Sequence, residues 1–372
     1  MWWILVLLIP LCLVYGLMVL GFWIGLRKSS KSFEPINKVP MPISVVIPVR
    51  NEEQNMEKLL NSLSNIDYPT ELFEIVMVND NSTDQCWAIA QSWMERMKNL
   101  VLLELSPEKT GKKDALTLGI SQTLHSIVVL TDADCEHPTN WLSEISNSYK
   151  QNRWCMLIGP VMISPTNSVF QKMQALEYAS LMASSLGACA LGFPVMASSA
   201  NLAFVKKTIG FNHQMLEPRQ TSGDDVFLLH NTKRDKCNTV HYSYSIENLV
   251  TTKPVGSVKE FFFQRARWAS KAPAYRDLPT ILIALVVLLF NLMIVALVVG
   301  SIFYSKLWLL LFFALALKII VDLPLLSTFL KNFKQTSLLR FYLPLQLVYP
   351  LYIVVAFGIS VIMPVVWKER KG

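Results

Sequence analysis

Long stretches without a charged residue constrain this chain more than any other feature of its sequence. The stretches are residues 2–26, 278–305, 341–367 and, interrupted only by Lys318 and Asp322, residues 307–330. About 20 consecutive apolar residues suffice for a helix to cross a bilayer core. We therefore predict a multi-pass membrane protein with a transmembrane anchor at residues 1–27 and about three membrane helices within residues 278–367.

Positive charges predict the orientation of these helices. Arg27 and Lys28 follow the first stretch, and Lys and Arg near membrane ends favour the cytoplasmic side. The polar region 40–257 is therefore predicted to be a cytosolic domain at the cell (inner) membrane. The last stretch is either a fourth crossing or a broken helix, because a full crossing would place basic residues on both sides of it. These residues are Lys331, Lys334 and Arg340 before it, and Lys368, Arg370 and Lys371 after it.

The composition agrees with a membrane protein and excludes other classes. Hydrophobic residues make up 52% of the chain and charged residues 16%. The net charge of +7 fits a positively charged cytoplasmic membrane face. Since no basic run is interleaved with aromatic residues, we predict no nucleic-acid partner.

Two segments with membrane-like features are ambiguous. Residues 179–197 are uncharged but rich in Ala, Ser and Gly, so we predict a buried or interfacial helix of the cytosolic domain. Lys318 and Asp322 are spaced to pair on one helical face. They are either a functional pair inside the membrane bundle or a pair at a helix end near the interface.

The six cysteines show neither CxxC pairs nor zinc-ligand spacing with histidines. We predict that they are small buried hydrophobic residues in a reducing compartment.

Short apolar runs alternate with helical patterns across the first half of the polar region. Runs at residues 43–49, 74–79, 101–105 and 127–131 have strand character, and alternation of this kind predicts a doubly wound, mostly parallel α/β sheet. Ligands bind beyond the carboxyl ends of such strands. Polar clusters lie at these ends, at residues 50–53, 80–84 and 132–134.

Several of these polar residues suit the binding of phosphate and metal. Asp132 and Asp134 follow a strand, and hard carboxylate oxygens there suit Mg²⁺ or Mn²⁺, although two acids at a strand end can also be an ordinary turn. Gly111-Lys112-Lys113 opens a helix, where an N-terminus and a lysine favour phosphate; solvated lysines are the alternative.

Two later motifs have both a catalytic and a structural interpretation. In Gly223-Asp224-Asp225 an acid precedes a helix, either as a cap or as a general base. Residues 258–277 contain Gln264-Arg265-Ala266-Arg267-Trp268 and read as an interfacial helix. Alternatively, an arginine there binds phosphate beside an aromatic platform for a sugar ring.

The ordered set VVIPVRNEE, NDNSTD, GKKDAL, DAD, GDD and QRARW resembles the family 2 glycosyltransferases with the GT-A fold. The resemblance implies residue roles that we adopt as predictions. Asp225 is the catalytic base. The donor is bound by Glu52, Asp80, Lys112, Asp132, Gln264 and Arg267. The acceptor is bound by Trp268, Asn201 and Asp224. The metal ligands are Asp134 and Asp132. Two positions depart from the pattern, Asn79 in place of a common aspartate and Thr117 in place of an asparagine.

The resemblance implies an inverting, metal-dependent transfer of a hexose or N-acetylhexosamine from a nucleotide-sugar, with uridine as the expected base. Two acceptor classes remain open, because lipid-modifying enzymes and processive polysaccharide synthases share QRARW. An exported polymer needs a pore of several helices, whereas about four are predicted here. We therefore favour a lipid or lipid-linked acceptor, with a processive synthase as the alternative.

Overall fold

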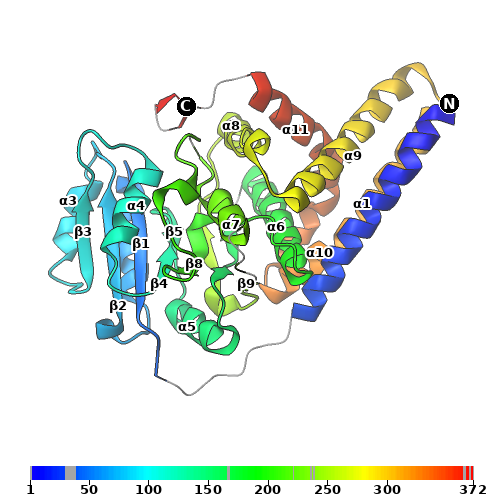
Figure 1. Cartoon of the computed structure of the whole chain (residues 1–372). Helices are drawn as coiled ribbons and strands as arrows, with labels where there is room; N and C mark the ends of the chain where they lie inside the picture. The colour runs from blue at the N-terminus through cyan, green and yellow to red at the C-terminus, as the bar shows by residue number, and fades with distance from the viewer. Residues whose placement is uncertain are drawn as a thin grey trace.

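The computed structural model describes residues 2–29, 39–165, 168–220, 222–234, 237, 239–362, 366–367 and 370–371, with backbone alone at 2–4, 29, 366–367 and 370–371. An α/β domain occupies one end of the molecule, and long apolar helices extend from it (Figure 1). Of the residues on which the sequence analysis relied, Lys368 lies outside the described residues, and the side chains of Arg370 and Lys371 are not described.

A seven-stranded, mixed sheet forms the centre of the α/β domain as described. Strands β3, β2, β1 and β4 are mutually parallel, β8 is antiparallel to both of its neighbours, and β6 and β9 are parallel to each other. In spatial order the strands are β3 (Leu100–Glu104), β2 (Phe73–Asn79), β1 (Ile43–Val49), β4 (Ile127–Leu130), β8 (Leu202–Val205), β6 (Met156–Ile158) and β9 (Val240–Tyr242). The predicted mostly parallel α/β fold is confirmed.

Helices cover both faces of this sheet because their apolar residues recur at helical spacing. The helix α2 (Glu53–Ser64) buries Met56, Leu59, Leu60 and Leu63 on one side. The remaining helices of the domain are α3 (Cys86–Trp93), α4 (Lys112–Gln122), α5 (Trp141–Asn152), α6 (Val169–Ala190), α7 (Asp224–Arg234) and α8 (Val258–Ala269). A small second sheet pairs β5 (Cys135–Glu136), β10 (Val250–Thr252) and β7 (Val161–Ile163).

Four helices among the described residues are long and apolar enough to cross a membrane. They are α1 (Trp2–Ser29), α9 (Leu278–Phe303), α10 (Leu307–Asn332) and α11 (Tyr342–Ile362, which a short 3-10 turn precedes). The N-terminus of α1 lies at the end of the bundle that points away from the sheet (Figure 1). A two-residue ladder, β11 (Val366–Trp367) with β12 (Arg370–Lys371), follows α11.

Two glycines bring the N-terminal helix directly against the α/β domain. A Cβ atom at Gly25 in α1 would lie 2.5 Å from the carbonyl oxygen of Gly187 in α6, and a Cβ at Gly187 would collide with the backbone of Phe22. The two helices therefore approach backbone to backbone, as small residues permit. Most of α6 is buried, as predicted for this segment, but the helix ends at Ala190, so residues 191–197 of the predicted helix are not helical.

The charged pair inside α10 is held within the helical bundle. Lys318 Nζ lies 2.6 Å from Asp322 Oδ2, and the Lys318 side chain is only 2% exposed. The Tyr15 hydroxyl of α1 donates to Asp322 at 2.8 Å, and the Gln346 amide of α11 donates to it at 3.1 Å. The pair thus connects three helices, and the alternative of an interfacial pair at a helix end does not apply.

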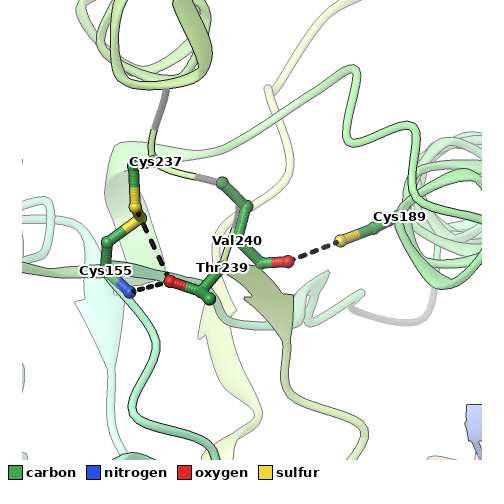
Figure 2. The surroundings of a disulfide bond; sticks show 5 residues. All are labelled: Cys155, Cys189, Cys237, Thr239 and Val240. Carbon is green, nitrogen blue, oxygen red and sulfur yellow. Dashed lines mark hydrogen bonds between the residues drawn. A yellow bond between two sulfur atoms is a disulfide. The ribbon is translucent and has the colours of Figure 1, made fainter. Parts of the chain in front are cut away.

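A disulfide joins Cys155 to Cys237, so the prediction of six unpaired cysteines was wrong for these two residues (Figure 2). The physical reason is strand pairing, because β6 begins at Met156 directly opposite Val240 of β9. Residues 82 positions apart are thereby brought together, which sequence spacing does not reveal. Cys86, Cys135 and Cys189 are buried thiols and Cys12 is half-buried, as small apolar residues would be.

Reduction of this disulfide is expected to destabilise the α/β domain. In the chain-entropy model, opening a loop of this length costs about 4.5 kcal/mol. For a domain of 150–250 residues this lowers the melting temperature by roughly 10 °C. Thermal unfolding in detergent with and without reductant measures the effect. Cys237→Ser should remove the response to reductant and Cys189→Ser should retain it; an unchanged melting temperature of the wild type in reductant would contradict the prediction.

Candidate active site

The ammonium group of Lys112 is the point at which three distant segments meet. Lys112 Nζ donates to Asp132 Oδ1 at 2.6 Å and to Ser199 Oγ at 2.7 Å, and it lies 3.5 Å from Asp224 Oδ2. Lys112 opens α4, Asp132 follows β4, and Asp224 opens α7. Ser199 belongs to a 3-10 turn (Ser199–Asn201) directly before β8. The sheet therefore gathers motifs that are separated by more than 100 residues in the chain.

Neighbouring opposite charges keep both Lys112 and Asp224 ionised, although both are buried. Burial alone would lower the pKa of Lys112, but Asp132 and Asp224 raise that pKa above its usual value. Burial likewise opposes the charge of Asp224, but Lys112, Lys271 and Lys113 outweigh it and lower the pKa of that carboxyl. Lys112 and Asp224 are thus held as a charged pair.

The Asp132–Asp134 pair lies at the edge of the sheet together with a third carboxylate. Burial raises the pKa of Asp134, and the negative charges of Asp132 and Glu52 raise it further. The hydroxyl of Thr252 in β10 donates to Asp134 Oδ2 at 3.1 Å. A divalent cation bound to these hard oxygen atoms would offset the repulsion between the carboxylates.

These residues fit a metal whose coordination shell is completed by the substrate, rather than a metal bound by protein ligands alone. No group of three or more His, Cys, Asp or Glu side chains with metal-binding geometry occurs among the described residues. Mg²⁺ commonly takes one or two carboxylates and receives its other ligands from phosphates and water. Asp132 and Asp134 match that incomplete ligand set.

Asp80 is buried next to the site and connects the loop after β1 to the loop before α4. Its side chain is 2% exposed, and its Oδ1 accepts a hydrogen bond from the backbone N–H of Gly111 at 2.8 Å. Arg50 after β1 donates to the Asp80 carbonyl at 2.7 Å. Asp80 therefore fixes the loop before Lys112, and its predicted contact with the donor stays a prediction.

Asp225 is half-buried at the first turn of α7, where a cation faces it. Lys271 Nζ lies 4.0 Å from Asp225 Oδ1, and the Lys271 side chain is 10% exposed. Burial raises the pKa of Asp225, although Lys271 opposes the shift. The carboxylate is therefore a stronger base than an ordinary surface aspartate.

The helix α8 contributes side chains to the same region. Burial lowers the pKa of Arg267, and the charges of Asp224, Asp225 and Asp132 counteract this effect. The half-buried indole of Trp268 has its ring centroid 5.9 Å from that of Tyr178. Gln264 instead accepts a hydrogen bond from Arg265 at 2.6 Å.

Asn201 is placed differently from its predicted role at the acceptor. The residue is 2% exposed, its Oδ1 accepts from the indole of Trp141 at 3.0 Å, and its Nδ2 donates to Asn248 O at 2.7 Å. A Cβ atom at Gly159 would collide with this amide. Asn201 therefore positions the turn that carries Ser199, and a direct contact with the acceptor is not favoured by this arrangement.

Sequence reasoning overlooked Lys271 and Ser199 as members of the site. Lys271 lies two residues beyond the end of α8, so helical spacing from Arg267 does not extend to it and no local pattern indicated its role. Ser199 lies two residues before Asn201, the one residue of this turn to which the sequence analysis assigned a role. A cavity of about 300 Å³ that is lined by Phe227, His230 and Asp277 contains none of the predicted site residues. We define the site by the convergence of charged groups rather than by that cavity.

Two family models match the chain. "Glycosyl transferase family 2" matches residues 44–208, and "Glycosyl transferase family group 2" matches residues 127–323, more than half of the chain. The solved mannosyltransferase PcManGT from Pyrobaculum calidifontis, in complex with GDP-Man and Mn²⁺, is 17% identical with a TM-score of 0.53. That similarity covers 95% of this chain and 99% of that one, and it supports the fold alone.

Curated relatives match over shorter segments. Glycosyltransferase AglE of Haloferax volcanii is 34% identical over 100 residues, which are 27% of this chain and 33% of the relative. An undecaprenyl-phosphate 4-deoxy-4-formamido-L-arabinose transferase of Photorhabdus laumondii is 28% identical over 142 residues, 38% of this chain and 42% of the relative. The matched part therefore spans less than half of either relative.

Proposed function

This chain belongs to the family 2 glycosyltransferases, and we propose that it transfers a sugar from a nucleotide-diphosphate donor to a lipid or lipid-linked acceptor at the membrane. The observation that carries the proposal is the Lys112 ammonium group, which contacts Asp132, Ser199 and Asp224 at once. A cation between carboxylates at the carboxyl edge of a sheet suits a diphosphate and an attacking hydroxyl side by side.

In this proposal the donor occupies the edge formed by β1, β2 and β4. Lys112 and Arg267 neutralise the diphosphate, Glu52 and Asp132 contact the nucleoside side, and Asp80 fixes the loop before Lys112. Gln264, whose amide oxygen accepts from Arg265, would donate to the diphosphate from its amide nitrogen. Asp132 and Asp134 would hold Mg²⁺ or Mn²⁺, which would offset the charge that develops on the leaving diphosphate.

Asp225 removes the proton from the acceptor hydroxyl in this mechanism. Its elevated pKa makes it an effective base, and Lys271 keeps enough of it ionised to act. With a single base the hydroxyl attacks the anomeric carbon directly, which inverts the configuration. Trp268 and Asp224 bind the acceptor, with the indole as a platform for a sugar or headgroup.

Two features favour an acceptor from the membrane. Trp268 lies on α8, and α8 leads within ten residues into the apolar helix α9. The exposed Phe263 on the same helix suits contact with lipid. Of the curated relatives, the Photorhabdus enzyme is named for undecaprenyl phosphate and another, from Pyrococcus furiosus, for dolichol phosphate.

Labelled nucleotide-sugars test the proposed function directly. Membranes that contain the protein are incubated with radiolabelled UDP-hexoses, UDP-N-acetylhexosamines and GDP-hexoses, then extracted with organic solvent. Label in the lipid phase above an Asp225→Asn control supports the proposal. Label in a large water-soluble polymer would favour a processive synthase instead, and no label above the control with any donor would reject transferase activity.

The acid limb of the pH–rate profile should depend on Lys271. A base must be deprotonated, so kcat/KM falls as the pH drops through the raised pKa of Asp225. Lys271→Met removes the cation that opposes this rise, so the limb should move to higher pH by about one unit. Lys207→Met, at an exposed lysine after β8, is the matched control. An unshifted limb in Lys271→Met would contradict the pairing of Lys271 with Asp225.

A further inference from the structure

Arg265, the first arginine of QRARW, is buried and binds a carboxylate outside the active site, Glu177. The Arg265 residue is 5% exposed, and its guanidinium donates two hydrogen bonds to Glu177 of α6, one of them from Nε at 3.2 Å. The same guanidinium lies over two aromatic rings, 4.6 Å from the Phe261 centroid and 4.1 Å from the Trp268 centroid. Arg265 therefore holds one face of the Trp268 indole.

Glu177 has a second partner on a membrane helix. The hydroxyl of Tyr352 in α11 donates to Glu177 Oε1 at 2.5 Å, and Glu177 is 1% exposed. Tyr352 also packs against Phe261, with ring centroids 5.5 Å apart. Three elements far apart in sequence, α6, α8 and α11, thus meet at one buried carboxylate.

We propose that Tyr352 is a positioning residue for the acceptor platform, acting through Glu177 and Arg265 on the Trp268 indole. This inference rests on the proposed function, in which Trp268 contacts the acceptor. A buried charge pair is stable only when its remaining hydrogen-bonding capacity is satisfied, and Tyr352 supplies one of these bonds to Glu177. Without the hydroxyl, Glu177 and Arg265 relax together, and the cation no longer defines the tilt of the indole.

The consequence is that the last apolar helix takes part in building the active site without contributing an atom to it. A chain truncated before α11 would retain every predicted site residue but lose this support. Membrane insertion of α11 and the geometry of the acceptor platform are therefore physically connected.

The test uses a mild substitution and a matched one on the same helix. Tyr352→Phe removes only the hydroxyl that donates to Glu177. Tyr342→Phe, also in α11, removes a hydroxyl that donates to the Ile319 carbonyl at 2.7 Å. Both keep the aromatic ring, so folding should survive in each. For Tyr352→Phe we expect the KM for the acceptor to rise about tenfold, the factor that 1.4 kcal/mol represents, with donor affinity unchanged. Tyr342→Phe should change neither.

A double-mutant cycle separates positioning from general structural support. In a Trp268→Leu background, Tyr352→Phe should have an effect of less than about twofold, because the indole that it positions is gone. Multiplicative effects of the two substitutions would overturn the inference, and so would equal changes in Tyr352→Phe and Tyr342→Phe. If the full-length wild type itself transfers no sugar, the proposed function fails instead, and the two failures are thereby distinguished.

Discussion

Asp225→Asn is expected to abolish sugar transfer while leaving donor binding nearly unchanged. The amide keeps the shape of the side chain and can still accept from the Val226 N–H, where the carboxylate now accepts at 2.8 Å. It cannot take a proton from an acceptor hydroxyl at neutral pH. General-base catalysis contributes about 10²- to 10⁴-fold to a rate, so kcat should fall by that factor.

Single-turnover transfer and donor binding by calorimetry measure the two parts separately. Asp67→Asn, at an exposed aspartate after α2, provides a control for a changed carboxylate elsewhere. Turnover within a few-fold of the wild type in Asp225→Asn would remove Asp225 as the base. Loss of donor binding in parallel with turnover would show instead that Asp225 supports the donor side of the site.

Removal of divalent metal is expected to stop the reaction reversibly. Asp132, Asp134 and Glu52 concentrate negative charge at the edge where we propose that the donor diphosphate binds, so a bound donor there would require a counter-charge beyond Lys112. If the metal supplies several kcal/mol of stabilisation in the transition state, the rate falls by roughly three powers of ten without it.

Activity in EDTA, followed by titration with Mg²⁺ or Mn²⁺, measures this dependence. EDTA that has been saturated with Mg²⁺ beforehand controls for effects of the chelator itself. Asp134→Ala should require a higher metal concentration for half-maximal rate, whereas Asp67→Asn should not. Full activity in excess chelator would refute the metal ligands that we assign.

The parallel half of the sheet was predictable because its information is local. The run 43–49 is apolar at every position except Ser44 and forms β1, and the spacing of Met56, Leu59, Leu60 and Leu63 predicts the buried face of α2. The parallel strands place their carboxyl ends at one edge, so the sequence also predicted that Asp132 would lie near the residues that follow β1 and β2. The antiparallel placement of β8 between β4 and β6 has no such local signal.

The candidate site was only partly predictable. Six of the predicted residues lie close enough to shift one another's pKa values: Asp132, Asp134, Asp224, Asp225, Lys112 and Arg267. Asn201 was assigned by resemblance, but its buried amide serves the packing of its turn. The partners of Arg265 were invisible in sequence, because Glu177 precedes it by 88 positions and Tyr352 follows it by 87.

The sequence by itself determined which segments are apolar enough for a bilayer, which form parallel strands, and which charged residues follow those strands. Periodicity and hydrophobicity act over a few neighbouring residues, so they can be read along the chain. Only the tertiary structure decided that Cys155 bonds Cys237, that Lys271 faces Asp225, and that Tyr352 of α11 and Arg265 of α8 share the Glu177 carboxylate. These pairings depend on how strands and helices distant in sequence pack against one another, and no local pattern encodes that packing.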